Sequence, residues 1–161
     1  MRECGAIRTN SRGDLAEHAG ARFIGPMDEV IHEGGCLCGQ VRWRARGEPA
    51  NVRVCHCRLC QAATGAPFFA RAIFLAERIE WSGETTRWPT SPRIDRLSCA
   101  RCGTPMFAQP HDPPARLAVS LATLDDKDAI APACHIWVSR KLAWLPLDDG
   151  LPQHAEGFQA A

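Results

Sequence analysis

Seven of the nine cysteines of this 161-residue chain lie in three short clusters, and no other feature constrains the fold as strongly. The clusters are CLC at residues 36–38, CHCRLC at residues 55–60 and CARC at residues 99–102. Closely spaced thiolates of this kind are typical ligands of zinc, which takes four protein ligands in structural sites and three in catalytic sites. Seven sulfurs therefore predict two zinc ions, one enclosed by cysteines and one with an open position.

Three alternatives to zinc are a disulfide framework, iron–sulfur clusters and hard cations. Disulfides need an oxidising compartment, but the N-terminal sequence MRECGAIRTNSRGDLAEH is charged throughout and lacks the apolar region of a secretory signal. We therefore expect a cytoplasmic protein without a disulfide framework. Iron–sulfur clusters are also held by thiolates and stay open as an alternative, whereas calcium and magnesium prefer oxygen ligands.

Length and charge exclude several classes of protein. A chain of 161 residues and 17.7 kDa fits one domain with its own core. No apolar stretch has the length of a membrane helix, so we expect no membrane partner. The 19 basic and 18 acidic residues give a net charge of +1, which offers no electrostatic footprint for nucleic acid. The oligomeric state is not predicted.

The first 26 residues differ in composition from the rest of the chain. They are rich in Gly, Ala and Arg and show neither strand alternation nor a helical face. We interpret residues 1–26 as a disordered N-terminal extension and residues 27–161 as a single zinc-binding domain. Met27 is a candidate for the true start codon, and Cys4, within the extension, is expected not to be a ligand.

From residue 40 onward the sequence has the pattern of short strands. VRWRA alternates apolar Val41, Trp43 and Ala45 with arginines, as in a strand with one buried face. Turn residues separate the similar segments FFARAIF, RIEW, RIDRLSC, PMFAQ, RLAVSLATL and CHIWVS. Helical turns are expected only at 58–64 and 124–129. The pattern predicts a mainly antiparallel β domain.

Cys55, Cys57 and Cys60 lie within six residues, so one loop can present all three to a single ion. Zinc bound by three thiolates carries a net negative charge, which makes it a poor acid toward water. It can still accept a fourth thiol as thiolate and lower the pKa of that thiol. The expected chemistry is therefore that of thiols and not hydrolysis.

Two pairs of neighbouring residues raise the question of histidine ligands. The His56 side chain should point away from those of the adjacent cysteines, so we do not expect it to bind the metal. Cys134 and His135 are a second candidate pair, for which a small buried thiol and a histidine with satisfied hydrogen bonds are favoured.

Four segments taken together resemble the glutathione-dependent formaldehyde-activating enzyme family, which shares its domain with centromere protein V. They are GGCLCGQVRW, VCHCRLCQAATGAPFF, LSCARCGTPMF and HIWVSRKLAWLPLDDGLPQHAEGF, and the resemblance runs from about residue 32 to 158. It implies an Mss4-like zinc-binding β fold of short antiparallel strands with zinc knuckles. It also implies that Cys36, Cys38, Cys99 and Cys102 hold a structural zinc and that Cys55, Cys57 and Cys60 hold a second, reactive zinc.

The reaction implied by the resemblance is addition of the glutathione sulfur to formaldehyde, a carbon–sulfur lyase activity like that of S-(hydroxymethyl)glutathione synthase. In this scheme the thiol takes the open position on the second zinc, loses its proton and attacks the aldehyde. Another small thiol or a related aldehyde would also fit. Arg58 and Arg71 are candidate partners for the carboxylates of glutathione. The alternative is a non-catalytic, zinc-stabilised module that binds glutathione or another protein.

Overall fold

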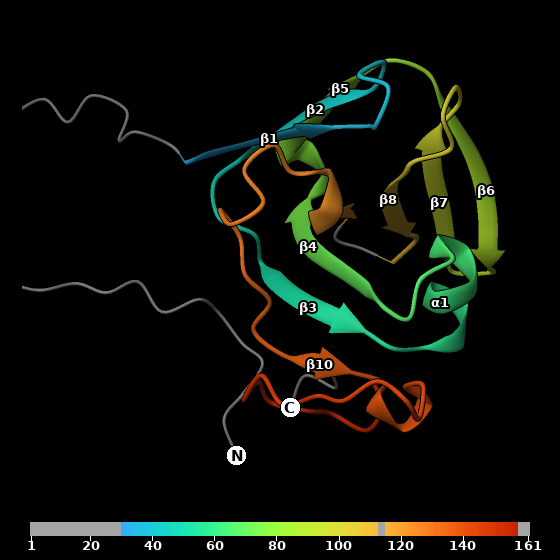
Figure 1. Cartoon of the computed structure of the whole chain (residues 1–161). Helices are drawn as coiled ribbons and strands as arrows, with labels where there is room; N and C mark the ends of the chain where they lie inside the picture. Colours follow the sequence, from blue (N-terminus) through green and yellow to red (C-terminus); the bar gives the residue numbers. More distant parts are fainter. Residues whose placement is uncertain (1–29, 113–114, 158–161) are drawn as a thin grey trace, which may run out of the picture.

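The computed structural model describes residues 30–112 and 115–157. The predicted extension 1–26 and Cys4 lie outside these residues. The described part of the chain contains ten strands, one α-helix and three short 3₁₀ turns. Figure 1 shows how these elements are arranged. The strands are β1 Ile31–Gly35, β2 Arg42–Arg46, β3 Asn51–Cys55, β4 Phe69–Leu75, β5 Ile79–Ser82, β6 Thr85–Ser91, β7 Ile94–Cys99, β8 Pro105–Pro110, β9 Arg116–Ser120 and β10 His135–Ile136. The helix is α1 Arg58–Thr64, and the 3₁₀ turns are η1 Ala76–Arg78, η2 Leu121–Thr123 and η3 Val138–Arg140.

The strands form two sheets. The small sheet has the order β1-β2-β5, and the large sheet has the order β10-β3-β4-β9-β8-β7-β6. All pairs are antiparallel except β10 with β3, which is parallel. The prediction of a mainly antiparallel β fold is therefore confirmed.

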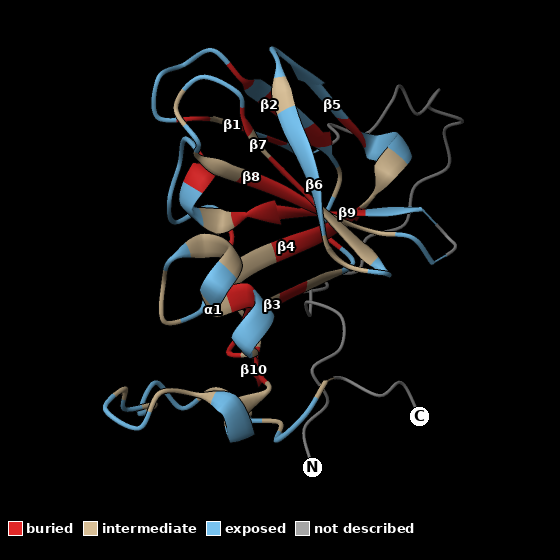
Figure 2. Cartoon of the chain, turned by 90° about the vertical axis from the view of Figure 1, so that its right-hand side faces the viewer, coloured by how far each residue is buried: buried red, intermediate tan, exposed pale blue. Residues whose placement is uncertain are grey.

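Three strands were not predicted, and each has a physical reason. Two of the five residues of β1 are glycines, and β3 follows a turn-rich segment. Strand β6 contains Pro89, which is tolerated because β6 is an edge strand (Figure 2). The helix predicted at 58–64 is present. The helical turn predicted at 124–129 is absent, because Leu124 pairs with Gly34 in a β-bridge and the residues after it form a turn.

The large sheet separates two hydrophobic clusters, because successive residues of a strand point to opposite faces. Along β4, Ala72 and Phe74 pack in one cluster, whereas Phe69 and Ile73 pack in the other. The first cluster lies between the sheets and includes Trp43 of β2. Cysteines enter both clusters: Cys36 and Cys99 belong to the first, and Cys55 and Cys60 belong to the second.

Gly34 of β1 is packed so closely that it has no room for a side chain. A Cβ there would lie 2.1 Å from the Thr123 carbonyl oxygen and 2.6 Å from the Trp43 ring. We expect Gly34→Ala to lower the free energy of unfolding by about 3 kcal/mol, because backbone must move to relieve the overlap. Urea denaturation of the metal-loaded protein measures this loss. The control is Gly150→Ala, where a Cβ meets nothing but φ is +75°, with an expected loss of about 1 kcal/mol. Equal losses would contradict the close packing at Gly34.

Candidate metal centres and the adjoining pocket

The sulfurs of Cys36, Cys38, Cys99 and Cys102 converge and form what we call the four-cysteine cluster. All four Sγ atoms lie within 4.8 Å of one another. The Sγ atoms of Cys36 and Cys38 are 3.5 Å apart, and those of Cys38 and Cys99 are 3.8 Å apart. Zinc–sulfur bonds in tetrahedral geometry require about 3.7 Å between sulfurs. The donor set and spacing of this cluster therefore fit zinc.

The four-cysteine cluster joins the two sheets. Cys36 and Cys38 lie in the turn between β1 and β2, and Cys99 and Cys102 lie at the turn between β7 and β8. Thr104 links the two turns, because it accepts from the Leu37 amide at 3.2 Å and contacts Cys102 Sγ at 3.1 Å. The same Thr104 hydroxyl, with its backbone, lowers the pKa of Cys102 to about 5.

The three-cysteine cluster, Cys55, Cys57 and Cys60, lies where β3 passes into α1. Its three Sγ atoms lie within 4.8 Å of one another. Cys55 ends β3, and Cys57 is the N-cap of α1, where its sulfur accepts from the Cys60 amide at 3.4 Å. Among residues 30–112 and 115–157, no further cysteine, histidine or carboxylate offers a fourth ligand atom to this group. The cluster therefore fits a metal with one position not filled by the protein.

Arginines surround the three-cysteine cluster. The Arg96 guanidinium donates to Cys60 Sγ at 3.2 Å and that of Arg71 lies 4.0 Å from the same sulfur. Arg96 is 5% exposed, and its guanidinium lies 4.9 Å from the centre of the Phe69 ring. Hydrogen bonds from Cys55 and Cys57, followed by the two guanidinium charges, lower the pKa of Cys60 to about 2. The surroundings thus favour negative charge on the Cys60 sulfur, whereas the neighbouring sulfurs and burial raise the pKa of Cys55.

A pocket of about 420 Å³ opens over the three-cysteine cluster. All three cysteines line it, together with the apolar side chains of Leu59, Ile94 and Trp137. Thr90 and four arginines complete the wall, and the arginines are Arg58, Arg71, Arg96 and Arg140. The structure thus places the predicted Arg58 and Arg71 at the pocket, although their contact with a substrate remains a proposal. Arg96, Arg140 and Trp137 were not singled out from the sequence.

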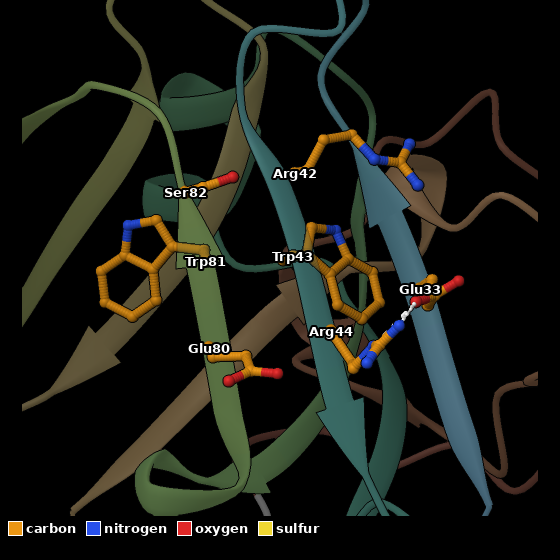
Figure 3. Close-up of a pocket in the computed structure, with 7 residues that line it drawn as sticks. All are labelled: Glu33, Arg42, Trp43, Arg44, Glu80, Trp81 and Ser82. Carbon is orange, nitrogen blue, oxygen red and sulfur yellow. Dashed lines mark hydrogen bonds and ion pairs between the residues drawn. The ribbon is translucent and has the colours of Figure 1, made fainter.

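A different hollow, of about 370 Å³, lies on the small sheet (Figure 3). It contains no cysteine, and its charged side chains pair with one another or with neighbours. Arg44 contacts Glu33 at 2.6 Å, and Arg42 pairs with Asp125. Because these charges are already paired, they have little capacity to bind a ligand. The pocket over the three-cysteine cluster is therefore the better candidate for a functional site among the described residues.

The seven clustered cysteines form no disulfides. Cys134, in contrast, is disulfide-bonded. Cys134 is fully buried, as expected, but the expectation of a free thiol at this position is wrong.

His56 turns away from the cysteines and into a series of hydrogen bonds that runs from two buried histidines to exposed Asp149. Its Nε2 lies 2.8 Å from His135 Nδ1, and His135 Nε2 lies 2.8 Å from Asp149 Oδ2. The hydrogen bond to His135 lowers the pKa of Asp149, so Asp149 accepts as a carboxylate and His135 donates from Nε2. When His135 is neutral, its Nδ1 then accepts from His56 Nε2. These hydrogen bonds anchor the loop of the three-cysteine cluster to the C-terminal part of the domain.

We expect His135→Phe to lower the free energy of unfolding by about 1–3 kcal/mol. The substitution leaves the nitrogen of His56, which is 0% exposed, without its partner. The surface pair of His111 and Asp95, 3.3 Å apart, supplies the matched control. His111→Phe should change stability by less than about 0.5 kcal/mol. Urea denaturation of both variants measures the difference, and a His135→Phe variant as stable as wild type would contradict the anchoring role.

Comparison of the sequence with models of known protein families identifies the family to which the chain belongs. The sequence model described as glutathione-dependent formaldehyde-activating enzyme matches residues 31–140. The chain belongs to this family. The resemblance inferred from the sequence motifs is thereby confirmed, and the span that matches the formaldehyde-activating enzyme model includes both cysteine clusters and every residue that lines the pocket over the three-cysteine cluster.

A solved structure supports the fold of this family member. The crystal structure of a Rhodobacter sphaeroides protein, determined as a structural genomics target, superposes with a TM-score of 0.51 at 20% sequence identity. The match covers 76% of this chain and 98% of that protein. At this identity the likeness concerns the fold alone. Within the described residues, no helix has the length and apolar character needed to cross a bilayer.

Proposed function

We propose that this protein is a zinc-dependent enzyme of the carbon–sulfur lyase type. It would join glutathione, or another small thiol, to formaldehyde or a related aldehyde and form an S-hydroxymethyl thiol. The observation that carries the proposal is the three-cysteine cluster, which offers three sulfurs without a fourth protein ligand among the described residues and lies in the wall of a pocket. The seven clustered cysteines are free and the disulfide at Cys134 is no framework, so we propose the cytoplasm as the compartment.

The two cysteine clusters would have different roles, one structural and one catalytic. The four-cysteine cluster would hold a structural zinc between the two sheets. A zinc ion at the three-cysteine cluster would supply an added coordination position that lowers the pKa of an incoming thiol. In the overall reaction the sulfur–carbon bond forms and the thiol proton passes to the former aldehyde oxygen, so no oxidant or leaving group is needed.

The protein's own side chains would bind and orient the thiol substrate. Glutathione carries two carboxylates, and exposed Arg58 and Arg140 lie at the pocket wall to receive them. The Nε atoms of Arg71 and Arg96 are buried and lack a hydrogen-bond partner among the described residues. They are therefore suited to an anionic group deeper in the pocket, beside the sulfur that Arg96 already contacts. Holding thiol and aldehyde together would supply much of the acceleration.

The proposal is tested by the rate at which labelled formaldehyde exchanges with its glutathione adduct, measured by NMR exchange spectroscopy. The adduct also forms without a catalyst, so the rate is compared with and without equimolar zinc-loaded protein. We expect the protein to raise the exchange rate at constant equilibrium position. An unchanged rate with glutathione bound would contradict the enzyme and indicate the non-catalytic binding module. An unchanged rate without glutathione binding would contradict both.

A further inference from the structure

Trp137 has a backbone conformation that is unusual for a bulky residue. Its φ is +60° and its ψ is +37°, and it is the one non-glycine residue with positive φ in the described part of the chain. The left-handed region disfavours side chains with a Cβ, and large residues rarely occupy it. A conformation of this kind persists only where the surrounding structure imposes it, and it often marks a functional site.

The C-terminal segment of residues 154–157 imposes this conformation. The Trp137 amide donates to the Glu156 carbonyl at 3.0 Å, and the Ser139 hydroxyl donates to the Glu156 carboxylate at 2.9 Å. Gly157 packs against the indole so closely that a Cβ there would lie 3.3 Å from Trp137 Nε1. The segment therefore fixes both the backbone and the ring of Trp137.

The fixed indole forms part of the pocket over the three-cysteine cluster. Trp137 lines this pocket with Leu59 and Ile94, and it packs against the hydrophobic cluster that contains Cys55 and Cys60. Apart from the cysteines, the remaining wall is mostly cationic, because it consists of the four arginines and Thr90. The pocket thus offers a flat apolar surface and several positive charges beside the same sulfurs.

We propose that Trp137 is a specificity-determining residue that selects extended, anionic, peptide-like thiols. Its indole would contact the planar amide groups of such a thiol while the arginines hold the carboxylates. A thiol without amides or carboxylates, such as 2-mercaptoethanol, would reach the cysteines without touching the indole. The inference rests on the proposed function, since it requires that a thiol enters this pocket.

The test compares two thiols on three variants of the zinc-loaded protein by isothermal titration calorimetry. Trp137→Gly removes the indole and suits φ of +60°, Trp137→Ala removes the indole and keeps the disfavoured backbone, and Trp137→Phe retains an aromatic surface. We expect Trp137→Gly and Trp137→Ala to weaken glutathione binding about tenfold or more. Binding of 2-mercaptoethanol should stay within about twofold of wild type. Trp137→Phe should recover most of the glutathione affinity.

Thermal unfolding of the same variants separates a specificity role from a structural one. Trp137→Gly should melt at or above the temperature of Trp137→Ala, because glycine removes the backbone penalty. Glutathione binding that is unchanged in Trp137→Gly, or an equal loss for both thiols, would overturn the inference and leave the proposed function intact. A wild-type protein that binds neither thiol would overturn the proposed function as well, and this outcome is distinct from the first two.

Discussion

Cys99→Ser is expected to leave the chain unfolded at room temperature, with loss of metal from the four-cysteine cluster. Cys99 is 2% exposed, belongs to the core between the sheets and lies 3.8 Å from Cys38. The binding free energy of a structural zinc is folding free energy and amounts to about 10–16 kcal/mol in small zinc domains. The whole stability of a domain is about 5–15 kcal/mol. Loss of the zinc, which we expect once Cys99 no longer completes this core site, therefore removes a contribution as large as the total.

Circular dichroism and metal analysis of the purified variant measure this effect. The neighbouring Ser98→Ala, in the same strand but outside the cluster, is the matched control and should fold with full metal content. A Cys99→Ser variant that unfolds cooperatively near the wild-type midpoint would contradict a structural role for the four-cysteine cluster.

Cys57→Ser is expected to fold and to return the formaldehyde exchange rate to its uncatalysed value. Serine can keep the N-cap of α1, because its oxygen accepts from the Cys60 amide as the Cys57 sulfur does. The three-cysteine cluster, however, loses one of its three sulfurs. We expect the variant to keep about one zinc per chain, held by the four-cysteine cluster.

Ala62→Ser is the matched control for Cys57→Ser, because it adds a hydroxyl to a position of the same helix that is not buried. It should accelerate exchange as the wild type does. If Cys57→Ser were as unfolded as Cys99→Ser, both clusters would be structural. If it were fully active, the three-cysteine cluster would not be the site of the reaction.

The cysteine clusters could be predicted from the sequence because their ligands are local. Three ligands of one cluster lie within six residues, and the other cluster joins two pairs of close neighbours. Strand alternation predicted β2, where buried residues alternate with exposed arginines. Strand β6 was not predicted because it contains Pro89, and proline is tolerated in a strand only at the edge of a sheet. The sequence of one strand does not show whether that strand lies at an edge.

The surroundings of the three-cysteine cluster could not be predicted, because they come from distant strands. Arg96 lies 36 residues from Cys60 in sequence yet contacts its sulfur. One signal was present: alternation along RIDRLSC puts Arg96 on the face opposite Leu97 and Cys99, so it had to lie on the other side of the large sheet. Trp137 carried no such signal, since its conformation depends on residues 154–157.

The central claim is that a thiol substrate binds at the three-cysteine cluster and not at the four-cysteine cluster. Cadmium-113 NMR of the cadmium-substituted protein tests it directly, because the chemical shift of this nucleus increases with the number of sulfur ligands. We expect two resonances, one for each cluster. Glutathione should move the resonance of the three-cysteine cluster toward that of the four-cysteine cluster and leave the latter unchanged. If the chemical shifts of both resonances stayed unchanged on addition of glutathione, thiol binding at the three-cysteine cluster would be contradicted.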